Sequence, residues 1–257
     1  MQNQKTFTKL VLLSALIVTV ATMLMAFSRR DPGSLAFAAQ EKTSKSEDEK
    51  KMPIAVYSAS LPADSAERAL RLARSGRYDK RFTEPFDQAS PTATETSVIS
   101  DWYVYMSALP VAESDLIVSG EVLSANGYLS NDRTGAYSEF IIHIDDVLKD
   151  DGRQSGRSII AVREGADVQL PSGRIIRYYI LHQGTPRIGR QYVFFLKYNE
   201  QGKDYTILTG YELRKNRVFP LDEVEPFNAY RKYDGSTFLN AVRQAIAQPS
   251  EKRRLNQ

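Results

Sequence analysis

The first pattern along the chain is an apolar run from Leu10 to Phe27, which contains no charged side chain and is broken only by Ser14, Thr19 and Thr22. As a helix this run would be about 27 Å long, close to the thickness of the hydrocarbon core of a bilayer. Lys5 and Lys9 precede it, as basic residues precede the apolar region of a signal sequence. We therefore predict that residues 1–39 form a signal anchor or signal peptide, which contacts the cell membrane through Leu10 to Phe27.

Two fates are open for this leader. It can remain as a single-pass anchor that holds the domain outside the cytoplasm, or it can be cleaved near Ala38 to release a secreted or periplasmic product. The apolar run is longer than that of most cleaved signals, which favours the anchor. Basic residues are almost equally frequent on both sides of the run, so the positive-inside rule leaves the orientation open.

The leader is followed by residues 40–51, QEKTSKSEDEKK, which carry charges of both signs and no large apolar side chain. Such a segment buries too little apolar surface to offset its ordering entropy, so it predicts a disordered linker. We assign residues 52–109 to a helix and loop segment. Within it, the Pro-, Ser- and Thr-rich residues 82–100 predict a loop.

A helix is expected in this segment, beginning at Ala63 or Asp64 and ending at Ser75, with Gly76 as its cap. Arginines recur along it at every third residue: Arg68, Arg71, Arg74 and Arg77. The stripe can bind anionic lipid headgroups or another acidic polymer. It can also be a solvated helix face, and the absence of aromatic anchors favours this second interpretation.

From Asp101 onward, apolar and polar residues alternate with a period of two, which is typical of strands with one buried face. Strands are expected at residues 116–123, 139–148, 157–163, 168–170, 174–181, 191–198, 205–213 and 217–221. The turn residues Pro171-Ser172-Gly173 predict a hairpin over 168–181. Residues 191–198 are apolar on both faces, as in a central strand.

These elements predict a mainly β fold. We expect a small antiparallel β-barrel in residues 110–248, preceded by the N-terminal membrane helix and the short helix. An amphipathic C-terminal helix is expected from Ser236 to Ala247, with Asp234 or Ser236 as its cap, and residues 249–257 should form a frayed tail.

The barrel region resembles a known family. The successive segments ESDLIVSGEV, YSEFIIHIDDVLK, SIIAV, PRIGRQYVFFLKYN and YTILTGYEL resemble the OB-type β-barrel of tissue inhibitors of metalloproteinases and netrin-type modules, and uncharacterised exported bacterial proteins with such a barrel. The resemblance covers residues 110–215 and implies an OB-like fold. Those inhibitors chelate zinc through an N-terminal cysteine, and this chain has no cysteine, so that activity does not transfer. The hairpin at 168–181 also stands where an OB-fold often has a helix.

Composition excludes several classes of function. Four of the 34 basic residues precede Asp31, which leaves 30 against 31 acidic residues in the rest of the chain. A nearly neutral domain argues against nucleic-acid binding. The absence of cysteine excludes disulfides, thiolate nucleophiles and Cys-ligated metals.

The strand at 139–148 carries the most suggestive polar residues. Its apolar face is expected to hold Phe140, Ile142, Ile144 and Leu148, and its other face Glu139, His143 and Asp145. The three polar residues could form a metal or acid–base group, since neighbours two apart on a strand lie near 7 Å. They could also be a solvent-facing surface, which is favoured because Ile141 interrupts the set.

Two further features allow a functional and a structural interpretation. Ser130-Asn131-Asp132 contains one acid among small polar residues, which suggests a calcium ligand but is more typical of a turn. The 14 tyrosines could stack on sugars or grip a peptide, or could occupy strand positions for which Tyr has high propensity.

Two classes of function remain. The first is a membrane-tethered or secreted, non-enzymatic β-barrel module that binds a protein or an envelope polymer such as a polysaccharide. The second is an envelope hydrolase that uses carboxylates such as Glu139 or Glu164. The sequence contains no recognisable catalytic, cofactor or metal motif, and this favours the first.

Overall fold

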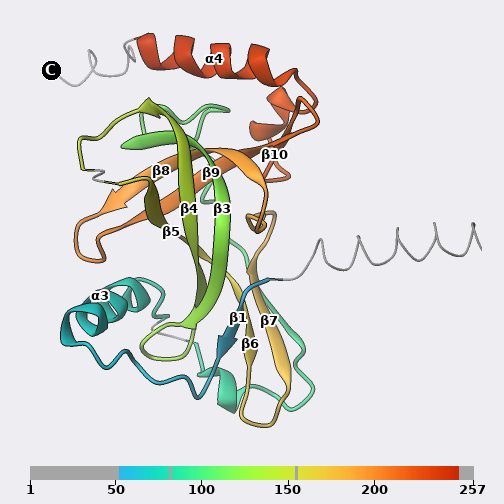
Figure 1. The fold of residues 1–257 in the computed structure, drawn as a ribbon. Helices are drawn as coiled ribbons and strands as arrows, with labels where there is room; N and C mark the ends of the chain where they lie inside the picture. Colours follow the sequence, from blue (N-terminus) through green and yellow to red (C-terminus); the bar gives the residue numbers. More distant parts are fainter. Residues whose placement is uncertain (1–51, 81–82, 154–155, 249–257) are drawn as a thin grey trace, which may run out of the picture. The chain divides into compact units, whose positions relative to one another are not determined.

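The computed structural model describes residues 52–80, 83–153 and 156–248. The predictions for the leader, for the linker at 40–51 and for the tail at 249–257 lie outside these residues. From Met52 onward the chain is one compact unit, built mainly of β-strands with two α-helices (Figure 1). No helix within the described ranges is long and apolar enough to cross a membrane.

The larger sheet has six strands in the order β10-β9-β5-β4-β3-β8. Its strands are β3 (Leu116–Leu129), β4 (Ala136–Lys149), β5 (Ser158–Glu164), β8 (Gln191–Asn199), β9 (Asp204–Arg214) and β10 (Arg217–Pro220). Because β8 also pairs with β9, the strands β3, β4, β5, β9 and β8 are paired in a closed cycle. The β5–β9 pairing is parallel and the other pairings of the cycle are antiparallel.

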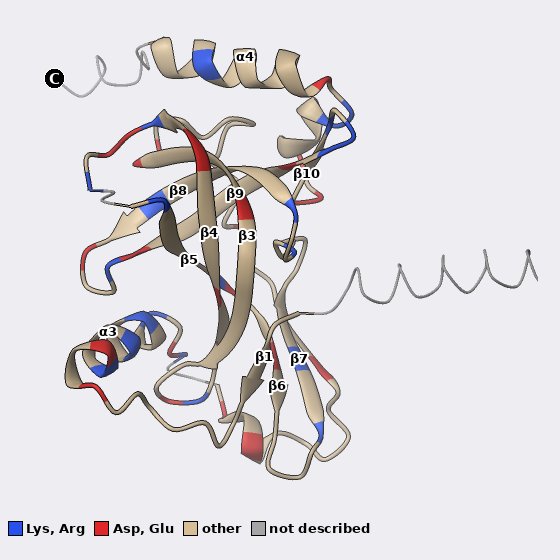
Figure 2. Cartoon of the chain, in the orientation of Figure 1, with Lys and Arg blue, Asp and Glu red and all other residues tan. Residues whose placement is uncertain are grey.

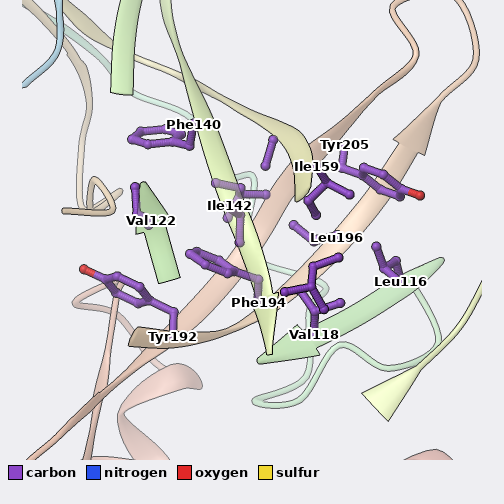
Figure 3. Close-up of a cluster of buried hydrophobic side chains, with 13 residues drawn as sticks. Leu116, Val118, Val122, Phe140, Ile142, Ile159, Tyr192, Phe194, Leu196 and Tyr205 are labelled. Atoms are coloured by element: carbon purple, nitrogen blue, oxygen red, sulfur yellow. The ribbon is translucent and has the colours of Figure 1, made fainter. Parts of the chain in front are cut away.

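Strand β8 is apolar on both faces, as its sequence predicts, because it separates two apolar cores. Phe194 and Leu196 belong to the cluster enclosed by the larger sheet (Figure 3). Val193 and Phe195 point the other way, into a cluster that contains Phe238 of the C-terminal helix α4 (Gly235–Ala247). Burial of both faces explains why this strand lacks the period-two alternation of its neighbours.

Helix α4 confirms the predicted C-terminal helix. Its cap is Asp234, whose side chain accepts hydrogen bonds from the backbone N–H groups of Ser236 and Thr237 at 2.9 and 3.2 Å. Phe238 and Val242 are one turn apart and fully buried, so the helix covers the outer surface of the larger sheet with its apolar face.

One prediction for β4 was wrong. Leu148 does not share a face with Phe140; it packs in the outer cluster beside Ile117. The register between β3 and β4 shifts between Ile117 and Val118 and again between Ser119 and Gly120. Each such bulge adds a residue to one strand, so the alternation of faces is reset along β4.

The smaller sheet has four strands in the order β1-β6-β7-β2. They are β1 (Ile54–Val56), β6 (Ala166–Gln169), β7 (Ile175–Ile180) and β2 (Glu95–Val98). The antiparallel pairing of β6 with β7 confirms the predicted hairpin. Strands β1 and β2 add to its two sides in parallel, so the sheet combines residues from both halves of the chain.

The loop predicted over 82–100 was therefore wrong at β2, and a short 3₁₀ helix, η1 (Phe86–Gln88), precedes that strand. Four residues are too few to show a period in the sequence. Thr96 and Val98 turn inward only because β7 lies beside them. The strand exists through a partner about 80 residues away, which no local pattern can indicate.

Helix α3 (Ser65–Gly76) begins one residue beyond the predicted start at Ala63 or Asp64, and its cap is Asp64, whose side chain accepts the N–H of Glu67 at 2.8 Å. Its end differs by one residue. Gly76 is the last helical residue rather than the cap, and the backbone N–H of Arg77 donates to the carbonyls of the final turn.

Candidate functional site

Three of the four arginines of the stripe turn toward the larger sheet. Arg74 is only 1% exposed, and the side chains of Arg71 and Arg77 are 11% and 23% exposed. Only Arg68 faces solvent, where it donates to the carbonyls of Pro62 and Ala63. Both sequence interpretations, the lipid-binding patch and the solvated face, were therefore wrong for the three inward arginines. Figure 2 shows that α3 carries both basic and acidic residues.

The inward arginines bind acids of β4 and β9. Arg71 Nη1 lies 2.7 Å from Glu139 Oε1, and Arg74 Nη1 lies 3.5 Å from Glu139 Oε2. Arg77 pairs with Asp204, which is fully buried. We call these five residues the arginine–carboxylate cluster. The cluster brings buried and half-buried charges of both signs together, so it is the first place to look for chemistry.

The arginines of α3 also contact uncharged groups of the sheet and its turns. The guanidinium carbon of Arg71 lies 3.5 Å from the ring centroid of Tyr128, a close cation–π contact. Arg74 Nε donates to the backbone carbonyl of Gly202 at 2.9 Å. The helix therefore contacts the sheet through the ends of long basic side chains rather than through an apolar stripe.

Burial controls the protonation of the cluster's acids. It raises the pKa of Glu139, while the charges of Arg71 and Arg74 act in the opposite direction without cancelling it. Burial likewise raises the pKa of Asp204 against the hydrogen bond from Arg77. A raised carboxyl pKa suits a general acid, but that role also requires access to a substrate.

The structure separates the three polar residues predicted to share a face of β4. Glu139 is buried beneath α3, whereas His143 is half-buried opposite Glu121 of β3. Asp145 is exposed and lies at a register shift, where β4 has an extra residue. The favoured interpretation as a solvent-facing surface therefore holds for Asp145 and fails for Glu139. Within the described ranges, no group of three or more His, Cys, Asp or Glu side chains is placed to hold a metal.

The second candidate acid, Glu164, lies on the same face as Glu139, because Tyr137 pairs with Glu164 across β4 and β5. Glu164 accepts a hydrogen bond of 2.6 Å from the Tyr178 hydroxyl and pairs with Lys80 Nζ at 2.8 Å. The Tyr137 hydroxyl donates to Glu139 at 3.2 Å. Each carboxylate thus has a cation and a phenol as partners, whereas a glycosidase-type pair must face a water and a sugar.

The segment Ser130-Asn131-Asp132 is a turn, as the favoured interpretation predicts. Asp132 Oδ1 accepts hydrogen bonds from the hydroxyls of Ser130 and Thr134, at 2.7 and 2.6 Å. Burial acts to raise the pKa of Asp132, but these hydrogen bonds outweigh it and hold the pKa at about 2. The carboxylate stabilises the β3–β4 connection through hydrogen bonds that it accepts from the chain itself.

A second buried ion pair was not found by sequence reasoning. Arg163 Nη2 donates to both carboxylate oxygens of Asp222, at 2.7 and 2.8 Å. Thr209 and the backbone N–H of Gly184 also donate to this carboxylate. Asp222 is fully buried and accepts four hydrogen bonds, so it joins β5, β9 and the connections beside them.

All 14 tyrosines belong to the described residues, and most of them are buried or half-buried. Only Tyr105 and Tyr233 are exposed. Tyr178 and Tyr211, for example, pack inside apolar clusters. The tyrosines mainly fill β positions, and they leave no row of exposed rings on which a sugar chain could stack.

Exposed apolar side chains gather instead on the smaller sheet. Alternate residues of its strands point inward to the cluster that contains Ala55, Val168 and Ile176. The other face, which we call the outer sheet face, carries five exposed large apolar residues: Ile54, Val56, Ile175 and, just beyond β2 and β7, Ile99 and Leu181. They form two groups, Ile54, Val56 and Ile175 at one end of the face and Ile99 and Leu181 at the other, with the ion pair of Arg177 and Asp167 between them. Exposed apolar groups of this kind can mark an interaction site.

Comparison with protein-family models and with curated proteins found no match. The functional conclusion therefore depends on the site itself rather than on relatives. Two places matter for it: the arginine–carboxylate cluster, whose charges are paired with one another, and the outer sheet face, whose large apolar side chains are exposed.

The buried role of Arg74 is tested by comparison with Arg68 on the same helix. Arg74→Gln removes one of the two cations beside Glu139 and the buried donor to the Gly202 carbonyl, while Arg71 still pairs with Glu139, so we expect the free energy of unfolding to fall by about 2 kcal/mol. Arg68→Gln should change it by less than about 0.5 kcal/mol, because that side chain is exposed. Urea denaturation of both variants measures the difference, and equal effects would contradict a buried arginine face.

The raised pKa of Glu139 predicts a pH dependence of stability. A carboxyl whose pKa is higher in the folded state binds its proton more tightly there. Its contribution is therefore fully present below the unfolded pKa of about 4.3 and is lost as pH rises through the folded pKa. We expect the stability of the wild type relative to Glu139→Gln to decline as pH rises above about 4, as measured by urea unfolding. A difference that grows with pH would show that the arginines lower this pKa instead.

Proposed function

We propose that this chain is a membrane-tethered, non-enzymatic β-module that binds a protein partner through the outer sheet face. The observation that carries the proposal is the segregation of its side chains. Glu139 and Glu164, the acids that a hydrolase would use, are already paired with basic residues. Large apolar residues, in contrast, are exposed together on the smaller sheet. Exposed apolar side chains of this kind are typical of a surface that binds a partner.

A protein fits this surface better than a polysaccharide. Among the described residues, the exposed aromatic rings are those of Tyr105 and Tyr233, and both lie outside the outer sheet face. The face carries aliphatic anchors, with Ile54 and Val56 on β1 and Ile175 on β7, and polar residues such as Gln169 on β6 between them. Aliphatic anchors in a polar surround are typical of protein interfaces.

The proposed architecture of the larger sheet is an OB-like barrel. The closed cycle of five pairings and the apolar interior around Phe194 and Ile142 support it. The β6–β7 hairpin leaves this cycle between β5 and β8 and forms part of the smaller sheet. In this arrangement, the barrel is the support and the smaller sheet is the binding element.

The proposed location is the outer side of the cell membrane. Leu10 to Phe27 would serve as the anchor, and residues 40–51 would act as a flexible spacer between the anchor and the domain. If the leader is instead cut near Ala38, the same module would be secreted or periplasmic. Either form leaves the outer sheet face available to a partner.

The proposal is tested by crosslinking from defined positions. The chain has no cysteine, so Ile175→Cys provides a unique thiol on the outer sheet face for a photoreactive label. Gln244→Cys, on the exposed side of α4, is the matched control at the opposite end of the domain (Figure 1). In native membranes we expect a discrete protein adduct from Ile175→Cys and none from Gln244→Cys.

A charge placed on the same face identifies specific binding. Val56 and Ile175 both pair with Gln169, so Val56→Asp introduces a carboxylate two strands from the label. This change should reduce the adduct by at least about tenfold, since a buried unpaired charge opposes docking. Equal adducts from both labelled positions, or an adduct insensitive to Val56→Asp, would contradict the proposal.

A further inference from the structure

Strand β2 forms an edge of the smaller sheet, with β7 as its single neighbour among the described strands. The N–H of Arg177 donates to the carbonyl of Thr94 at 3.1 Å, and the N–H of Leu181 donates to the carbonyl of Val98 at 3.0 Å. In a parallel ladder, alternate residues of a strand bond to one neighbour, so Thr94, Thr96 and Val98 face β7.

The backbone groups of Glu95, Ser97 and Ile99 consequently point away from the sheet. They have no hydrogen-bond partner among the described residues. A row of free N–H and C=O groups at strand spacing is complementary to another extended backbone, and neither a helix nor a lipid headgroup supplies the same pattern. The chemistry of the edge thus specifies the conformation of what binds it.

The edge lacks most of the devices that block strand addition. Natural edges are protected by lysine, proline, bulges or a covering element, and β2 itself, Glu-Thr-Ser-Val, has a single charge at its start. Its pairing with β7 is regular, without a register shift. The small side chain of Ser97 also leaves the middle of the edge open to an approaching backbone.

The side chains next to the edge favour an apolar partner. Ile99, directly beyond β2, is 82% exposed, and Leu181 lies beside it on the outer sheet face. A strand added to β2 would place alternate side chains on this same face, in contact with Ile99. Backbone pairing would then supply affinity, and the apolar contacts would supply selectivity.

We propose that β2 is the docking site for an extended segment of the partner protein, which adds to the smaller sheet as a further strand. The inference rests on the proposed function and specifies the partner as a polypeptide with an accessible, apolar strand-forming segment. It also explains why the exposed apolar residues extend to Ile99 at this edge rather than ending at β7.

The test uses the full chain in lipid nanodiscs and a set of short capped peptides in which Thr alternates with Val, Ile or Phe. We expect at least one peptide to bind and to protect the amides of Glu95, Ser97 and Ile99 from hydrogen exchange. The same peptide, N-methylated at alternate residues, should bind at least about tenfold more weakly, because it cannot complete the ladder. Failure of every peptide to protect Ser97 would overturn the proposal.

Ser97→Pro supplies the complementary change in the chain. It removes an outward N–H and leaves the bonds of Thr96 and Val98 to β7 in place, so the sheet should keep its fold. We expect about tenfold weaker peptide binding for Ser97→Pro and unchanged binding for Ser97→Ala, which retains the backbone N–H. Equal binding by both variants would contradict an edge site.

Two results separate this inference from the proposed function. If the adduct from Ile175→Cys persists in the Ser97→Pro chain, the outer sheet face binds its partner without the edge, and only the inference fails. If the chain without peptide dimerises and protects Ser97, the edge is occupied by a second copy, which overturns a foreign partner as its ligand.

Discussion

The pairing of the arginines of α3 with Glu139 and Asp204 is the constraint on which the rest of the structure depends. It inverts the usual arrangement of a surface helix, because the charged face is buried and Leu72 on the opposite face is exposed. Moving charges out of water is costly, so each buried charge requires a partner in place. The surface of β4 and β9 beneath α3 is therefore committed to holding the helix.

The pairing of these buried charges also bears on the function of the domain. Glu139 and Glu164 lie on one face, as a hydrolase would need, yet they are neutralised by Arg71, Arg74 and Lys80. Inside the larger sheet, Asp222 is equally engaged by Arg163. The buried charges are therefore occupied in structural roles, whereas the large apolar side chains of the smaller sheet are exposed and available to a partner.

Sequence reasoning found the elements whose pattern is local. The β6–β7 hairpin, the two-faced strand β8 and the helix capped by Asp234 all follow from turn residues, apolar periodicity and capping preferences. It failed where the outcome depends on distant partners. The spacing of the arginines does not show whether they face solvent or the sheet. Strand β2 forms only because β7 pairs with it. Bulges in the β3–β4 pairing place Leu148 in the outer cluster rather than with Phe140.

The charged site was missed for the same reason. Glu139 lies in a strand of alternating polar and apolar residues, so it was expected to face solvent. In the structure, α3 covers Glu139, and the strand's own sequence gives no sign of this helix from an earlier part of the chain. The arginine spacing was the available signal, because residues three and four apart share a helix face and can meet one acid. Arg71 and Arg74 do meet Glu139 in this way.

The most direct measurement of this account is a double-mutant cycle between Arg74 and Glu139, with Arg74→Gln, Glu139→Gln and the combined variant compared by urea unfolding. The account predicts a coupling energy of about 1–3 kcal/mol, since the double variant leaves no buried charge of this pair without its partner. A coupling energy near zero would mean that the two charges are solvated, and that the arginine face of α3 is free for another function.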